Sequence, residues 1–194
     1  LPARVFSTPL VAGKRVFVLT GERTVLAYDG RTGARLWSQQ RLGEPLVLQQ
    51  PGVLLAVGDT LVAGMGARLS GLNPGNGQPR WEVPVASARG VNEIERLIDL
   101  VGPAARVQGN VCVRAFQSAV GCVDAQRGAL RWTKPANGAV GLAADGDRVY
   151  GAESNGRLLA WKLDNGEVQW QSELLLNRGL SAPLVAGRSL AIGD

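Results

Sequence analysis

The segment Ala27-Tyr-Asp-Gly-Arg-Thr-Gly33-Ala-Arg-Leu-Trp37 sets the pattern of the whole chain, because its framework returns three more times. Each copy ends on a tryptophan, with a glycine four residues before it and a small residue ten before it. The copies occupy residues 27–37, 71–81, 122–132 and 160–170. Self-similarity at a regular interval indicates a repeat architecture.

A second set of glycines gives the length of the repeat. A turn glycine precedes a Val- or Leu-rich segment at positions 13, 58, 109, 146 and 187, so successive glycines lie 45, 51, 37 and 41 residues apart. This spacing is typical of the four-stranded blade of a β-propeller. From turn glycine to tryptophan the chain advances 24, 23, 23 and 24 residues, whereas the links from tryptophan to the next glycine vary: 21, 28, 14 and 17.

The near-constant part of the repeat has room for three strands, and each variable link must hold the fourth. In the first repeat the three strands are expected at residues 16–19, 25–28 and 34–37. We therefore predict an all-β chain that forms about four blades of a β-propeller. The repeats span residues 10–53, 54–104, 105–141 and 142–182, and a further repeat begins in 183–194.

The recurring residues have structural explanations. Asp29 and Asp124 are placed to accept backbone amides in an Asx-turn, and the glycine supplies the left-handed conformation that the turn needs. The indole rings are large and flat enough to fill the wedge between neighbouring blades, and the small residue ten positions earlier leaves room for them. Blade docking is therefore the role expected of the four tryptophans, Trp37, Trp81, Trp132 and Trp170.

Composition bounds the class of protein. An apolar share of 45% with 19% charged residues is that of a soluble globular chain. The net charge of +5 is scattered, without the run of like charges typical of a nucleic-acid arm, so no nucleic-acid partner is expected. No uninterrupted apolar run reaches the roughly 18 residues of a membrane span. The first residues look neither like a signal peptide nor like a lipidation site, which favours a fragment of a longer protein.

Two families share the Asp-x-x-x-Gly-x-x-x-Trp framework. It resembles the repeat of pyrroloquinoline-quinone (PQQ) dehydrogenases and of their non-enzymatic relatives. The links resemble the BamB family more closely: residues 92–101, Asn-Glu-Ile-Glu-Arg-Leu-Ile-Asp-Leu-Val, are similar to its Glu-Ile-Asp-Arg-Leu-Ser-Asp-Val-Asp stretch. Residues 44–49, Glu-Pro-Leu-Val-Leu-Gln, resemble its Leu-Ser-Leu-Arg loop, and residues 170–187 also follow this family.

The resemblance implies a PQQ-like propeller of eight blades, of which about half would be present. It further implies a scaffold lipoprotein of the β-barrel assembly (BAM) complex at the periplasmic face of the outer membrane, held by a lipid anchor outside this chain. The implied partner is a POTRA domain of BamA, the third of the series, with unfolded outer-membrane proteins as further partners. At the implied POTRA site, Leu46, Leu48 and Asp99 match the family, whereas Gln49 replaces an arginine and Val101 an aspartate.

Link length points to the same two segments. Relative to the shortest link, the first has seven extra residues and the second fourteen, and these links follow neighbouring blades. Extra loop length on a rigid scaffold often carries binding residues, although loops also tolerate insertion without function. Within residues 91–101 the apolar spacing fits either a short helix or an irregular loop, in which Arg96 could pair with Glu93.

The alternative function, a fragment of a PQQ-dependent dehydrogenase, fits less well. Those enzymes carry adjacent cysteines and a calcium site of acidic and amide side chains, whereas here the only cysteines, Cys112 and Cys122, are ten residues apart. The chain also has no histidine, the commonest general base and zinc ligand. We therefore expect no enzyme activity, no catalytic residue, no metal and no cofactor.

The two cysteines occupy apolar and small-residue positions of the repeat, so they are first interpreted as core residues. They also flank a short turn near residues 117–118, which would place them on adjoining strands. A disulfide between Cys112 and Cys122 is therefore the second interpretation, since the periplasm is oxidising.

Overall fold

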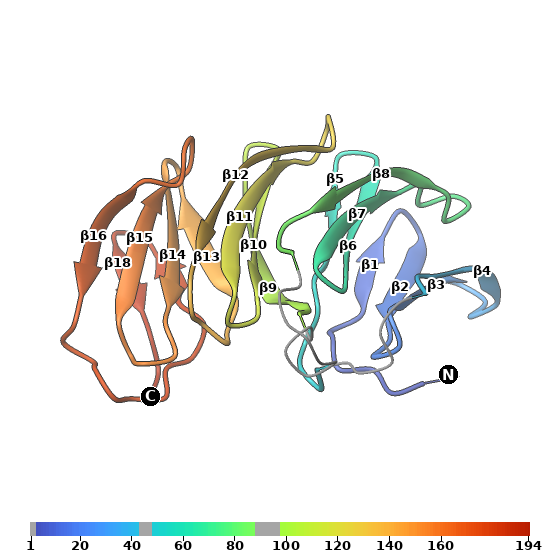
Figure 1. Ribbon diagram of the computed structural model, residues 1–194. Helices are drawn as coiled ribbons and strands as arrows, with labels where there is room; N and C mark the ends of the chain where they lie inside the picture. Colours follow the sequence, from blue (N-terminus) through green and yellow to red (C-terminus); the bar gives the residue numbers. More distant parts are fainter. Residues whose placement is uncertain (1–2, 43–47, 88–97) are drawn as a thin grey trace.

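A computed structural model describes residues 3–42, 48–87 and 98–194. The described chain forms four antiparallel sheets of four strands each and a final sheet of two. Within these ranges there is no helix with the length and hydropathy needed to cross a membrane. In Figure 1 the sheets follow one another side by side from the N-terminal blue sheet to the C-terminal red one, as the blades of a propeller do.

The strands follow the repeats in chain order. Sheet one contains β1 (Leu10–Ala12), β2 (Arg15–Leu19), β3 (Thr24–Asp29) and β4 (Arg35–Gln40). Sheet two contains β5 (Leu54–Val57), β6 (Thr60–Met65), β7 (Arg68–Leu72) and β8 (Pro79–Pro84). Sheet three contains β9 (Leu100–Val107), β10 (Asn110–Ala115), β11 (Ala119–Asp124) and β12 (Ala129–Pro135). Sheet four contains β13 (Leu142–Asp145), β14 (Arg148–Ala152), β15 (Leu158–Lys162) and β16 (Val168–Ser172), and β17 (Leu184–Ala186) pairs with β18 (Ser189–Ala191).

The sequence-based fold prediction is confirmed: the three strands expected in the first repeat are β2, β3 and β4, and the first strand of each following sheet lies in a link. One boundary differs. The boundary expected between residues 104 and 105 falls inside β9, because this strand is eight residues long and starts well before its turn glycine.

The core lies between the sheets. Buried side chains form three clusters, and each cluster joins two consecutive sheets: Phe17 and Val25 meet Leu61 and Leu72 between sheets one and two. Equivalent clusters join sheet two to sheet three and sheet three to sheet four. A single sheet has apolar side chains on both faces, so stacking supplies the burial that one blade lacks.

Each tryptophan of the first three repeats packs on the glycine that stands four residues before the next tryptophan. A Cβ atom on Gly77 would lie 2.6 Å from the Trp37 ring, one on Gly128 2.3 Å from Trp81, and one on Gly166 2.5 Å from Trp132. The indole N–H groups of Trp37 and Trp132 also donate to the next sheet, to the carbonyls of Pro74 (3.1 Å) and Leu163 (2.8 Å). These contacts therefore fix the position of each of the first three sheets relative to the next one.

The small residue of the repeat faces the tryptophan across a strand pair. Ala27 pairs with Trp37, and Gly71 pairs with Trp81. A Cβ atom on Gly71 would lie 2.2 Å from the Trp81 ring, so the ring occupies that space. The expected Asx-turn is present as well, since the Asp124 carboxylate accepts the backbone N–H groups of Gln126 and Arg127 at 3.0 Å.

Two further features sit within sheets three and four. Cys112 and Cys122 are direct partners across β10 and β11 and form a disulfide, and both are buried. Arg114, fully buried on β10, forms an ion pair of 3.0 Å with Glu153 of the fourth repeat. Burial lowers the pKa of Arg114 from its ordinary value, against the opposing effect of the Glu153 carboxylate.

Candidate functional site

Residues 48–53 of the first link and residues 98–102 of the second link meet beside sheets one and two. Backbone contacts join their ends: Gly52 forms a β-bridge with Val101, and the N–H of Gly102 donates to the carbonyl of Pro51 at 2.8 Å. The hydroxyl of Ser7 accepts the N–H of Gly52 at 2.8 Å. The two longest links thus converge on one place, although they are far apart in sequence.

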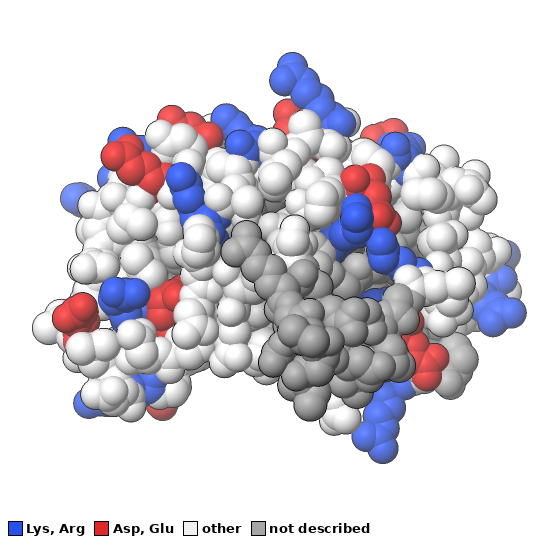
Figure 2. Space-filling view, viewed as in Figure 1, with Lys and Arg blue, Asp and Glu red and all other residues white. Residues whose placement is uncertain are grey.

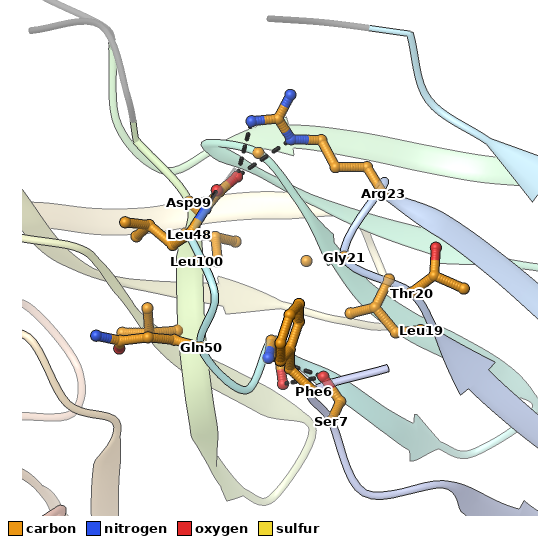
Figure 3. A pocket seen from close by; sticks show the side chains of 14 residues that line it. Phe6, Ser7, Leu19, Thr20, Gly21, Arg23, Leu48, Gln50, Asp99 and Leu100 are labelled. Atoms are coloured by element: carbon orange, nitrogen blue, oxygen red, sulfur yellow. Dashed lines mark hydrogen bonds and ion pairs between the residues drawn. The ribbon is translucent and has the colours of Figure 1, made fainter. Parts of the chain in front are cut away.

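Asp99 is the residue that connects these segments (Figure 3). Its Oδ1 accepts two hydrogen bonds from Arg23, from Nε at 3.1 Å and from Nη2 at 3.0 Å. Its Oδ2 accepts the backbone N–H of Leu48 at 2.9 Å. The side chains of Arg23 and Asp99 are only 11% and 14% exposed, so this ion pair is largely shielded from water. Charge-assisted bonds of this kind are the stronger ones in proteins.

The backbone around Asp99 is fixed to the neighbouring sheets. The Asp99 carbonyl accepts the N–H of Phe116, at the turn between β10 and β11, at 3.0 Å. The N–H of Leu100 donates to the carbonyl of Gly66, at the turn between β6 and β7, also at 3.0 Å. The end of the second link is therefore held by sheets two and three, while its carboxylate reaches sheet one.

A small cavity lies directly beneath the ion pair. It is lined by Phe6, Leu19, Leu48, Gln50 and Leu100, among others (Figure 3). Its walls come from the N-terminal segment, from sheet one, from the ends of both links and from strands β6 and β9. Within the described ranges no group of three or more His, Cys, Asp or Glu side chains could hold a metal ion. The site is thus a junction of backbone segments rather than a cluster of titratable groups.

The residues expected at a partner surface fall into different environments. Leu48 is half-buried, Gln49 is exposed and Asp99 is engaged by Arg23 and Leu48. Val101 is 2% exposed and lies within β9, where it pairs with Arg114 of β10 and forms a β-bridge with Gly52. Because this side chain is buried here, its expected place at a partner surface stays a prediction that these contacts do not support. Leu46 lies outside the described residues, as do Arg96, Glu93 and the expected helix or loop around them.

Sequence reasoning missed Arg23. Its partner Asp99 is 76 residues away, and no motif or spacing connects the two. Surface charge gives no stronger signal: on the face shown in Figure 2, basic and acidic side chains are interspersed over the molecule. Opposite charges also pair: the Glu82 carboxylate lies 3.2 Å from both the Arg41 and the Arg68 guanidinium. Only the folded arrangement identifies Arg23 as part of the site.

Comparison with known proteins gives the family. A family model described as outer membrane protein assembly factor BamB matches residues 1–172. The outer membrane protein assembly factor BamB of Burkholderia pseudomallei is 33% identical over 192 residues, which cover 98% of this chain and 50% of that protein. The protein of the same name from Bordetella pertussis is 33% identical over 189 residues, or 96% of this chain and 49% of the other. The chain spans about half the length of these curated relatives.

Solved structures give the fold. The crystal structure of BamB from Moraxella catarrhalis matches with a TM-score of 0.92 at 25% identity, covering 100% of this chain and 59% of that chain. A quinohemoprotein alcohol dehydrogenase from Comamonas testosteroni matches with a TM-score of 0.70 at 14% identity, over 98% of this chain and 39% of that chain, and this likeness concerns the fold alone. The predicted PQQ-like β-propeller class is thereby confirmed. The repeat framework, the two long links and these matches together place the chain in the BamB family of outer membrane protein assembly factors.

Proposed function

We propose that this chain is part of a non-enzymatic scaffold that supports the folding and insertion of outer-membrane proteins, at the periplasmic face of the outer membrane. It binds a POTRA domain of BamA, the third of the series, through the surface formed by its first and second links. The observation that supports the proposal is the bond from the Leu48 backbone to the Asp99 carboxylate, which brings one residue of each link together. The names of the relatives support the role in outer-membrane assembly.

The chemistry of the described part suits a protein partner. Leu48 offers a half-buried apolar group and the neighbouring Gln49 an exposed amide. Interfaces of this kind combine a few apolar anchors with a polar rim. The segments stand on sheets that pack against one another, and a rigid scaffold lowers the entropy that binding would otherwise cost. Unfolded outer-membrane proteins remain further partners in this proposal.

The test is capture of the POTRA region of BamA by the full chain carrying Leu48→Glu, alone and together with Leu46→Glu. A charged group at an apolar anchor should reduce affinity by at least about tenfold, equivalent to about 1.4 kcal/mol. Binding is measured by titration calorimetry, and a thermal melt establishes that the variants are folded. The matched control is Leu174→Glu, because Leu174 is 92% exposed and lies in the fourth repeat, so its affinity should stay unchanged. Undiminished binding by the double variant would refute the proposal.

A further inference from the structure

We infer that Arg23 is a positioning residue for this partner surface: it acts from the first sheet, outside both links, by holding Asp99 and through it the Leu48 backbone. The inference rests on the proposed function and assigns Arg23 and Asp99 roles within it. Neither side chain is expected to touch the partner. Both side chains instead hold the backbone of Leu48 in the conformation that the partner binds.

The carboxylate of Asp99 is already engaged within the chain. Oδ1 receives two bonds from Arg23 and Oδ2 receives the N–H of Leu48, and the Asp99 side chain is only 14% exposed. A carboxylate in this state has little surface left for a second protein. If Arg23 were removed, Asp99 would be a largely buried charge without its cation, and it would be driven to reorient toward water. The acceptor of the Leu48 N–H would be lost with that movement.

Arg23 is well placed for this role because its own hairpin is rigid. It lies in the turn between β2 and β3 with a φ of 56°, and its N–H donates to the Thr20 carbonyl at 3.2 Å. The same turn is tied to the N-terminal segment, where the Gly21 N–H donates to the Arg4 carbonyl at 2.8 Å. The guanidinium lies over Gly66, where an added Cβ would be 3.5 Å from Nε. Sheets one and two therefore contribute directly to the position of the cation.

Arg23 holds the first link at two points. Its backbone carbonyl accepts the N–H of Arg41 at 3.1 Å, at the beginning of the link. Its side chain holds Leu48 through Asp99, further along the same link. Arg41 and Leu48, two described residues of the first link, thus both depend on a single residue of the β2–β3 turn. Fixing a binding segment before the partner arrives is the general means by which a scaffold raises affinity.

A double-mutant cycle in the full chain tests the inference. The variants are Arg23→Gln, Asp99→Asn and the two combined, each titrated with the soluble POTRA region of BamA. Loss of a charge-assisted hydrogen-bond network should weaken binding by about tenfold in each single variant. Both changes disrupt the same network of Arg23, Asp99 and Leu48. The combined variant should therefore bind the POTRA region no more weakly than either single variant. Arg23→Lys keeps the charge but not the paired bonds, so its affinity should lie between those of the parent and Arg23→Gln.

Hydrogen exchange at the Leu48 amide gives a readout that needs no partner. Exchange should accelerate about tenfold or more in Arg23→Gln and in Asp99→Asn, while the melting temperature stays close to that of the parent chain. The matched control is Arg148→Gln, since Arg148 bonds Gln169 on the fourth sheet and should change neither quantity.

The outcomes separate this inference from the proposed function. Unchanged exchange at Leu48 in Arg23→Gln would overturn the positioning role whatever the partner does. Loss of binding in Asp99→Asn but not in Arg23→Gln, or strictly additive losses in the cycle, would also overturn it and identify Asp99 as a direct contact. Accelerated exchange in both variants, with binding unaffected even by Leu48→Glu, would instead refute the proposed function and leave the Arg23–Asp99–Leu48 coupling standing.

Discussion

The Asp29 carboxylate shows how one residue fixes the turn that every repeat needs. Its Oδ1 accepts the backbone N–H groups of Thr32 at 2.7 Å and Arg31 at 3.0 Å, as well as the Thr32 hydroxyl at 2.9 Å. These bonds favour the charged form, and they hold the pKa of Asp29 below the ordinary value of an aspartate, the Thr32 backbone bond having the largest effect. A turn built on such bonds weakens when the carboxylate is protonated.

The prediction at this residue concerns acid. Because the pKa of Asp29 is lowered by folding, its stabilising effect is complete above the pKa of an unfolded aspartate and is lost as pH falls through the lower, folded pKa. Thr32→Val removes the hydroxyl bond and leaves the backbone bond, so the pKa of Asp29 should rise part of the way toward its ordinary value. Carbon-13 NMR titration of the Asp29 carboxyl measures this change. Thr32→Ser retains a hydroxyl and should leave the pKa where it was; an identical pKa in Thr32→Val would contradict the explanation.

At the scale of the element, the glycines that stand four residues before the tryptophans have two separate roles. Gly33 and Gly128 occupy equivalent positions and both have a positive φ, 71° and 64°. A Cβ atom on Gly33 would meet no atom within 4 Å, whereas one on Gly128 would lie 2.3 Å from Trp81. The first glycine therefore serves the backbone alone, and the second also makes room for an indole ring.

This difference allows a matched pair of substitutions. Gly33→Ala should cost about 1 kcal/mol in the free energy of unfolding, since only the left-handed backbone is strained. Gly128→Ala adds a clash with a packed ring and should cost about 3 kcal/mol or more. Urea unfolding of the two variants measures both values. Equal losses would mean that the Trp81 ring moves aside freely and does not dock on this turn.

Local patterns explain how much of the element structure was predictable. The strands β2 to β4 followed from spacing, because a glycine turn and an alternation of apolar residues act over a few positions. Val101 shows where such reasoning stops. The resemblance assigned it to a partner surface, yet Leu100 and Val101 at the start of β9 are both buried, although β9 is the last strand of its sheet. Burial on both faces depends on neighbouring sheets, which no local pattern specifies.

The candidate site was predictable only in part for a related reason. Asp99 and Leu48 could be selected from the links that contain them, but their contact joins residues 51 positions apart. Arg23 lies in a short turn without any distinctive motif. Its role arises because stacking of sheets one and two brings that turn beside the end of the second link. Long-range contacts of this kind are a property of the assembled molecule.

On the scale of the whole molecule, stability should depend on the contacts between sheets rather than on any one sheet. Trp132 and Trp170 allow this to be measured, because they hold equivalent positions in neighbouring repeats. Trp132 is 7% exposed, packs on Gly166 and donates its N–H to the Leu163 carbonyl. Trp170 is 38% exposed, and among the described glycines none is covered by its ring. Its aromatic contact is with Tyr150 of its own sheet, at 5.9 Å between ring centroids.

Trp132→Ala should therefore lower the free energy of unfolding by about 3–5 kcal/mol, the usual cost of removing a large aromatic side chain from a core. Trp170→Ala removes a ring that is partly in water and covers none of the described glycines, so its cost should be about 1–2 kcal/mol. Chemical denaturation of the full chain measures both losses of unfolding free energy. Hydrogen exchange shows which amides lose protection. In Trp132→Ala, amides on both sides of the interface between sheets three and four should lose protection together, because that indole holds two sheets at once. In Trp170→Ala the loss should stay within sheet four. If the two variants lose equal stability, the indole rings stabilise only their own sheets. The packing of neighbouring sheets must then be stabilised by other contacts.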